Sequence, residues 1–106
     1  MIVYVKVGKL SAKETAMNIV QIKYVLEVGA SSSMREAARK LLVSEPALSS
    51  SIKELEEELG IRLFERTNRG ISLTEEGREF SGYADKALRQ YEALEERYLS
   101  RESAGK

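Results

Sequence analysis

Apolar residues recur every three or four positions in three short segments of the chain, a period typical of helices that bury one face. Asn18 opens the first segment as an N-cap, with the amide of Gln21 at the third helical position, and Gly29 closes it. The pattern predicts a helix over residues 18–29. Its buried face is formed by Ile19, Ile22, Val25 and Leu26.

The sequence predicts two more helices directly after the first. Ser33 and Glu36 have the spacing of a capping box, which predicts a short second helix. Ser44 is an N-cap for the third helix, Pro46 lies in its first turn, where the missing N–H costs nothing, and Gly60 stops it. The second helix buries Met34, Ala37, Ala38 and Leu41, and the third, residues 44–59, buries Leu48, Ile52, Leu55 and Leu59.

The period changes after the third helix. Two short β-prone runs, residues 61–66 and 71–73, flank the turn-forming tetrad 67–70, so we predict a two-stranded hairpin. Phe64 and Leu73 add to the core. The expected fold class is mostly α: three helices and a two-stranded wing form a winged helix-turn-helix. The layout alone also fits a three-helix bundle with a hairpin attached.

A long last helix is predicted from Thr74, an N-cap followed by Glu75 and Glu76 at the positive end of the helix dipole. Over residues 74–99 it would extend roughly 39 Å, farther than the small domain before it can cover. An apolar heptad seam runs along it, formed by Phe80, Ala84, Ala87, Tyr91, Leu94 and Tyr98. We expect this seam to form a homodimer; the alternative is that the helix packs back along its own domain.

The amino-acid composition excludes several kinds of functional site. The 106 residues include 17 Lys plus Arg, 17 Asp plus Glu, no His and no Cys, so the formal net charge is zero. Without imidazole or thiolate there is no disulfide and no zinc, haem or iron–sulfur site, and we expect no cofactor and no metal. No apolar run approaches the length that spans a bilayer. We expect no membrane contact and a cytoplasmic protein.

The two ends are set apart from the fold. Residues 1–16 are interpreted as an N-terminal extension, either a tag or the product of an upstream start codon, in which residues 2–7 have the composition of a short strand. Residues 17–73 form the winged helix-turn-helix domain and residues 74–99 the linker helix. Residues 100–106 are expected to form a flexible tail.

Five motifs in a fixed order carry a resemblance to a known family. They are Ala37-Ala38-Arg39-Lys40-Leu41, Val43-Ser44-Glu45-Pro46-Ala47-Leu48-Ser49, residues 52–60, Leu63-Phe64-Glu65-Arg66 and Leu73-Thr74-Glu75-Glu76-Gly77. With these motifs, residues 18–98 resemble the DNA-binding domain and linker helix of the LysR-type transcriptional regulators. The family's effector-binding domain is absent. We therefore interpret the chain as a truncated regulator, with a stand-alone small protein as the alternative; an effector small molecule would bind only through the absent domain.

The resemblance implies a function. In this family the third helix, here residues 44–59, lies in the major groove of double-stranded DNA, and the wing, residues 66–71, lies near the minor groove. A twofold dimer would place two such helices on a pseudo-palindromic operator. The residues expected to bind DNA are Arg35, Ser44, Glu45, Pro46, Ser49, Ser50, Lys53, Arg66 and Arg69.

Two residues of the third helix depart from the family pattern. Glu45 stands where the family usually has Gln, and Ser50 where it often has Arg. A carboxylate accepts a hydrogen bond from cytosine N4 but donates none, so we predict that Glu45 selects a cytosine-containing half-site. The alternative is that Glu45 only stabilises the first helical turn through the dipole.

The remaining candidates for contacts with DNA are cationic residues. Residues 17–73 hold eight Lys or Arg and eight Glu, but four of those Glu crowd the second half of the third helix, away from its reading end. Arg69, flanked by Asn68 and Gly70, has little to pack against and can enter a narrow minor groove. Its alternative is a solvated turn cation. Arg66 has the alternative of pairing with Glu65 or with a carboxylate of the third helix.

Other classes of protein stay open. One is a protein interaction module that dimerises or docks through the heptad helix, with a structural wing. Another is a winged-helix regulator of a different family, such as the molybdate-responsive or MarR-like regulators. An enzyme with paired carboxylates is disfavoured, because adjacent Glu residues on a helix do not face each other.

Overall fold

The computed structural model describes residues 17–100, so the expected N-terminal extension and, beyond Ser100, the expected tail lie outside the described residues. Its elements are α2 (Ile19–Ala30), α3 (Met34–Leu41), α4 (Glu45–Leu59), β1 (Phe64–Thr67), β2 (Gly70–Leu73), α5 (Glu75–Glu95) and η2, a π-helix (Glu96–Ser100). The mostly helical winged helix-turn-helix with a long helix after it is confirmed. None of the described helices is long and apolar enough to cross a bilayer.

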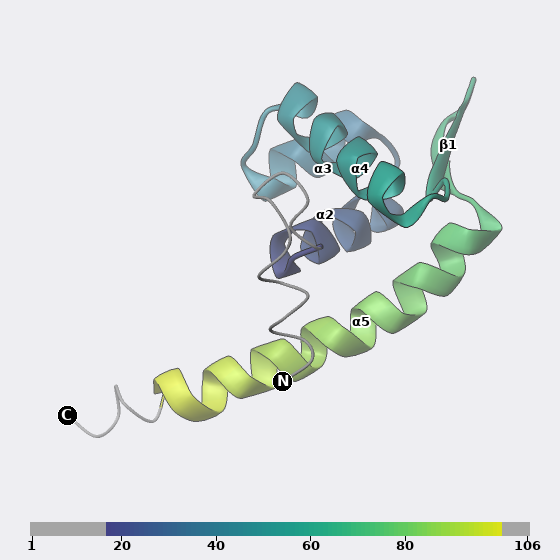
Figure 1. Cartoon of the computed structure of the whole chain (residues 1–106). Helices are drawn as coiled ribbons and strands as arrows, with labels where there is room; N and C mark the ends of the chain where they lie inside the picture. Colours follow the sequence, from purple (N-terminus) through teal and green to yellow (C-terminus); the bar gives the residue numbers. More distant parts are fainter. Residues whose placement is uncertain (1–16, 101–106) are drawn as a thin grey trace.

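The first three helices pack around one core, and the wing stands at the end of α4 (Figure 1). α5 starts beneath the wing, runs along α2 and continues past it. Val28 and Leu63 are fully buried but were not predicted to be so. Leu63 lies outside every periodic segment, whereas Val28 lies in the first helix beside the predicted apolar face. The core consists of Val25, Val28, Met34, Ala37, Ala38, Leu48, Ile52, Leu55, Leu63 and Phe64. Ile22, Leu26, Leu41 and Leu73 are half-buried rather than buried.

The helix caps agree with the sequence at most positions. Asn18 and Gln21 form the predicted reciprocal capping box, with bonds of 2.9 and 3.1 Å. Gly29, however, does not stop α2, which runs on to Ala30. A Cβ at this position would be 3.4 Å from the Leu73 side chain, an ordinary van der Waals contact, so the packing does not require glycine here.

The turn between α3 and α4 contains an unexpected backbone conformation. Leu42 has φ 60° and ψ 41°, the left-handed region, and is 90% exposed. Its N–H donates to the carbonyl groups of Ala38 and Arg39, which closes α3. Glycine or asparagine is the usual residue at such a helix end, so the sequence gives no signal for this conformation.

The wing is tighter than predicted. Thr67 pairs with Gly70, so only Asn68 and Arg69 lie in the turn, and Gly70 takes φ 127°. β1 begins at Phe64 rather than at residue 61, because Phe64 pairs with Leu73 and the residues after Leu73 belong to α5. Residues 61–63 therefore have no strand to pair with.

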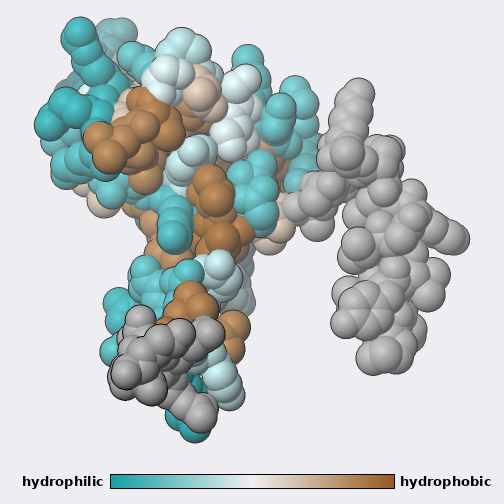
Figure 2. Space-filling view, turned by 90° about the vertical axis from the view of Figure 1, so that its left-hand side faces the viewer, coloured by the Kyte–Doolittle hydropathy of each residue, from teal (hydrophilic) through white to brown (hydrophobic). Residues whose placement is uncertain are grey.

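The apolar seam of the long helix divides into two parts. Phe80 packs against the core and Ala84 is 4% exposed, in the half of α5 that runs along α2. The alternative of packing back on the same domain therefore holds for this half. The other seam residues are exposed: Ala87, Tyr91, Leu94 and Tyr98, with Tyr83 beside them. Figure 2, which views the molecule from the C-terminal end of α5, shows apolar surface along this arm.

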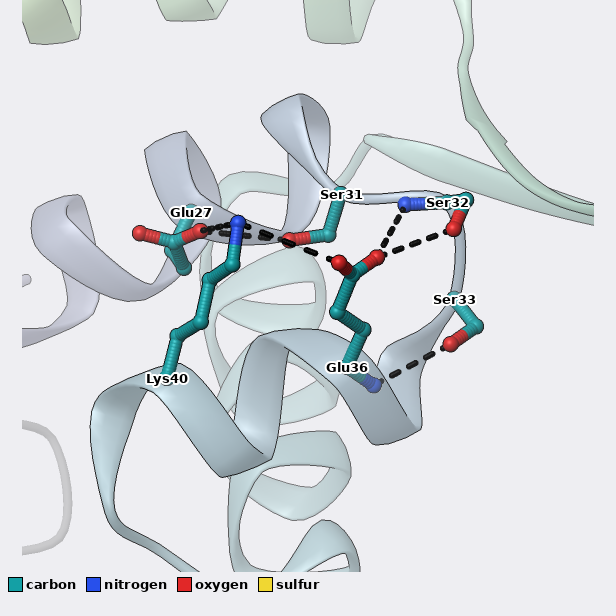
Figure 3. A network of polar contacts seen from close by, with 6 residues as sticks. All are labelled: Glu27, Ser31, Ser32, Ser33, Glu36 and Lys40. Atoms are coloured by element: carbon teal, nitrogen blue, oxygen red, sulfur yellow. Dashed lines mark hydrogen bonds and ion pairs between the residues drawn. The ribbon is translucent and has the colours of Figure 1, made fainter.

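A polar network holds the loop between α2 and α3 (Figure 3). The Ser33 hydroxyl accepts from the Glu36 N–H at 3.1 Å, as predicted. The carboxylate of Glu36 does not return the bond to Ser33 but accepts from the N–H and hydroxyl of Ser32, at 3.2 and 2.9 Å. These two bonds, and Lys40 3.9 Å away, hold the pKa of the Glu36 carboxyl below its usual value near 4.5.

The start of α5 is built around Thr74 and Gly77. The Thr74 hydroxyl donates to the carbonyl oxygen of Arg62 at 2.6 Å and accepts from the Gly77 N–H at 2.9 Å. The Thr74 N–H donates to the carbonyl oxygen of Leu63 at 2.9 Å. A Cβ on Gly77 would collide with this same Leu63 carbonyl. Residue 77 must therefore be glycine for α5 to approach β1 this closely.

We predict that Gly77→Ala lowers the free energy of unfolding by about 1–3 kcal/mol, because the new methyl group forces α5 away from Leu63. Gly82→Ala is the matched control on the same helix, since a Cβ there meets nothing within 4 Å. It is expected to raise stability by about 0.5–1 kcal/mol through helix propensity. Urea denaturation of both variants measures the difference; equal effects would contradict the close approach.

The depressed pKa of Glu36 predicts a pH-dependent stability. Its contribution is complete above the unfolded pKa and is lost as pH falls through the lower folded value. Glu36→Gln is therefore expected to lower Tm at about pH 7 and to change it less at about pH 3. Glu54→Gln, at an exposed site on α4, is the control and should lack this pH-dependent difference. Circular dichroism melts at both pH values provide the measurement.

Candidate nucleic-acid interface

The solvent face of α4 carries the residues that the sequence analysis selected. Leu48, Ile52 and Leu55 are buried on one side of the helix, which leaves the opposite side exposed. Of the predicted α4 contacts, Ser49 is half-buried, whereas Ser44, Glu45, Pro46, Ser50 and Lys53 are exposed. The selected residues share one face because they recur at intervals of three and four. The side chains of Ser44, Ser49 and Ser50 are short, so another molecule could approach the helix backbone closely at this end.

The N-terminus of α4 offers fewer free donors than the sequence suggested. The Ser44 hydroxyl accepts from the Ala47 N–H at 3.1 Å, as an N-cap does. Pro46 has no N–H, and the Ala47 N–H is already bonded to Ser44. The donor that remains in the first turn is the N–H of Glu45. The side chain of Glu45 also adds a carboxylate to this first turn. Side chains, rather than a row of backbone amides, therefore dominate the chemistry of this end.

Arg66 connects the wing to α4. Its Nη2 lies 3.5 Å from the hydroxyl oxygen of Ser49, across the gap between β1 and α4. Within residues 17–100 no ion pair joins Arg66 to Glu65 or to a carboxylate of α4, so that alternative is wrong. Ser49 and Arg66 are the two predicted DNA-binding residues that the structure brings into contact.

A cleft of about 420 Å³ lies where α3, α4 and the wing meet. Apolar and polar side chains line it together. The apolar ones are Met34, Ile52, Phe64 and Ile71, and the polar ones are Ser49, Arg62, Glu65, Arg66 and Thr74. Arg62 was not among the predicted residues. The signal in the sequence is a second cation four residues before Arg66, inside the run 61–66 that was predicted to be a strand.

Arg69 and Arg35 are exposed and occupy other elements. Arg69 lies in the two-residue turn of the wing, where its N–H donates to the Thr67 hydroxyl at 3.1 Å. Arg35 lies in the first turn of α3. Neither guanidinium is paired with a carboxylate in the part of the chain that the structure describes. Both charges are therefore free to meet an anionic partner.

Acidic side chains gather on other surfaces. Glu54, Glu57 and Glu58 are exposed in the second half of α4, and Glu75, Glu76 and Glu79 line a shallow depression on α5. Glu56, which the sequence analysis grouped with them, differs: its carboxylate accepts from the N–H groups of Leu63 and Phe64, at 2.7 and 3.2 Å. Among residues 17–100, no acidic cluster is arranged to hold a metal ion.

Comparison with known proteins agrees with this arrangement. Residues 19–78 match the model of the bacterial regulatory helix-turn-helix proteins of the lysR family. The HTH-type transcriptional regulator BenM of Acinetobacter baylyi is 43% identical over 72 residues, which is 68% of this chain and 24% of BenM. The transcriptional dual regulator OxyR of Escherichia coli is 38% identical over 80 residues, 76% of this chain and 26% of OxyR.

A solved structure shares both fold and sequence. The BenM DNA-binding domain, crystallised with benA site 1 DNA, superposes with a TM-score of 0.72 and 36% identity, and the match covers 85% of this chain and all of that one. The chain spans about a quarter of the length of the curated relatives it matches. Those relatives are transcriptional regulators by name. With a family model matching residues 19–78, more than half of its length, this chain belongs to the lysR family of bacterial regulatory helix-turn-helix proteins.

Proposed function

We propose that residues 17–73 bind double-stranded DNA sequence-specifically, as the reader domain of a LysR-type transcriptional regulator. α4 enters the major groove and the wing, residues 66–71, lies at the adjacent minor groove. The proposal rests mainly on the contact between Ser49 of α4 and Arg66 of the wing. This contact joins the wing to the solvent face of α4, where the side chains are short and polar. The BenM domain, a 36% identical neighbour, was solved bound to DNA, which supports the same role here.

The residues divide by role. In the first half of α4, the exposed Glu45 and Ser50 and the half-buried Ser49 beside them reach base edges. Ser44 and Pro46 lie at the helix end that approaches the backbone. The cations Arg35, Lys53 and Arg66 bind phosphate oxygens, and Arg69 enters the minor groove. None of these roles requires a cofactor, and we propose no enzymatic activity.

Residues 74–99, which comprise the N-cap of α5, α5 itself and most of η2, are proposed to form the linker helix and to pair two copies. Ala87, Tyr91, Leu94 and Tyr98 form an exposed stripe that nothing in the described chain covers. Pairing through this stripe would remove the apolar side chains from water and produce a twofold dimer. Such a dimer would bind a pseudo-palindromic operator in the bacterial cytoplasm. In a longer regulator, an effector small molecule would act through another domain.

One observation favours a second candidate. With a net charge of zero and an exposed apolar stripe on α5, the chain has features of a protein interaction module. That module would dock a partner through the stripe and would lack salt-dependent affinity for DNA. The experiment below separates the two.

Fluorescence anisotropy with a labelled duplex library, at two salt concentrations, tests DNA binding, and sedimentation measures the mass in parallel. We expect sequence-dependent, salt-sensitive binding by a dimer. Arg69→Ala should weaken binding and reduce the slope of log affinity against log salt by about one, because one cation is lost from the DNA. Arg89→Ala, whose guanidinium pairs with Asp85 on α5 at 2.8 Å, is the control with the same charge change. A dimer that binds no DNA would favour the interaction module.

Glu45→Gln tests the base-reading role. If Glu45 accepts from cytosine N4, the variant should lose its preference for cytosine at one position of each half-site, by about 1–3 kcal/mol of discrimination. The library is selected with the parent and with the variant, and Glu54→Gln, on the same helix outside the reading end, is the control. An unchanged preference together with a lower Tm would assign Glu45 to the helix dipole instead.

A further inference from the structure

The wing is supported at two points. At its base, Phe64 is buried in the core and its N–H donates to Glu56 at 3.2 Å. At the turn end, Gly70 lies against the carbonyl oxygen of Ser32, which would be 2.8 Å from a Cβ on that glycine. The first support holds the root of the hairpin next to α4. The second places the first residue of β2 against the loop that joins α2 to α3.

The carbonyl that supports Gly70 belongs to a residue that Glu36 holds in place. Glu36 accepts from both the N–H and the hydroxyl of Ser32, at 3.2 and 2.9 Å. Figure 3 shows the Glu36 side chain extending from α3 toward this loop, where the two bonds converge on one carboxylate oxygen. These two bonds hold Ser32 on the N-terminal side of its carbonyl, which belongs to the peptide unit between Ser32 and Ser33. On the other side of that unit, the Ser33 hydroxyl accepts from the Glu36 N–H at 3.1 Å. Glu36 therefore holds the chain on both sides of the carbonyl that faces Gly70.

Arg69 is the residue directly before Gly70, so their Cα atoms are about 3.8 Å apart. A change in the position of the Ser32 carbonyl would reach Arg69 through a single peptide unit. We propose that Glu36 is a positioning residue for Arg69: by holding Ser32, it sets the angle at which the wing presents Arg69 beside α4. The consequence for DNA affinity rests on the proposed function, whereas the effect on the wing does not.

The same network contains a matched control. Glu27 also accepts from a loop serine, the Ser31 hydroxyl at 3.1 Å, and also lies 3.9 Å from Lys40. Its partner Ser31 does not meet Gly70, which contacts Ser32 instead. Glu27→Ala and Glu36→Ala therefore remove the same charge from the same network, but only the second releases the support of the wing.

The first experiment needs no DNA. The chain has no cysteine, so Asn68→Cys and Glu54→Cys place two spin labels, one in the wing turn and one on α4, without labelling other sites. Pulsed electron resonance then measures the distribution of the distance between them. We expect Glu36→Ala to broaden this distribution, Glu36→Gln, which keeps an acceptor oxygen, to restore much of it, and Glu27→Ala to leave it unchanged. Equal distributions in Glu36→Ala and the parent would overturn the proposal.

Folding is checked on each variant by circular dichroism. Should Glu36→Ala unfold, Ser32→Ala serves instead, because it removes the 2.9 Å hydroxyl bond and keeps the backbone one. A partly broadened distribution would then support the proposal, and an unchanged one would contradict it.

The second experiment links the wing to DNA through a double-mutant cycle. If Glu36 acts through Arg69, Arg69→Ala should cause little further loss of affinity once Glu36→Ala is present, and both single variants should reduce the salt slope by about one. Fully additive losses would overturn the coupling. A parent that binds no DNA while the spin-label distances still depend on Glu36 would contradict the proposed function and leave the positioning role supported.

Discussion

The root of the wing depends on one carboxylate. Glu56, in the second half of α4, accepts hydrogen bonds from two successive backbone N–H groups, those of Leu63 and Phe64, at 2.7 and 3.2 Å. Both residues are buried, so their amides have no access to bulk water and losing the acceptor would be costly. The bond pair closes the short segment between α4 and β1. Because of it, β1 leaves α4 at a fixed place, and Arg66 lies within reach of Ser49.

The same short segment also sets the start of α5. The carbonyl oxygen of Leu63 accepts from the Thr74 N–H at 2.9 Å, while its N–H donates to Glu56. Leu63 therefore joins α4, the wing and α5 through its own backbone. Gly77 leaves the space that this arrangement needs. A fully buried side chain with both backbone groups in use explains why three elements keep one geometry.

Much of this fold follows from local sequence signals. The N-caps at Asn18, Ser33, Ser44 and Thr74 were predicted because each lies next to an apolar repeat, and all four are confirmed. These local signals do not predict which residues contact one another in the folded structure. Gly29 looks like a helix stop, but α2 continues through it to Ala30. Glu56 looks like one more surface charge, but it accepts from two backbone N–H groups of buried residues. The role of Glu56 depends on partners that lie outside its own helix.

For the candidate site, the sequence placed the α4 residues on one face correctly, because the helical period alone decides that. It could not decide the partner of Arg66, which depends on how the wing meets α4. The apolar seam of the long helix had a regular heptad spacing, yet Phe80 and Ala84 are covered by the chain itself. Periodicity identifies an apolar face but does not say what covers each part of it.

The divided seam has a geometric consequence. The first half of α5 is fixed against α2 and the wing, and the exposed second half continues in the direction that this packing sets. With 21 residues, α5 is about 32 Å long. In a dimer formed through the exposed half, the distance and angle between the two α4 helices would be decided by how α5 packs on α2. Buried residues far from any DNA, such as Ala84, would then help to determine the spacing of the two operator half-sites.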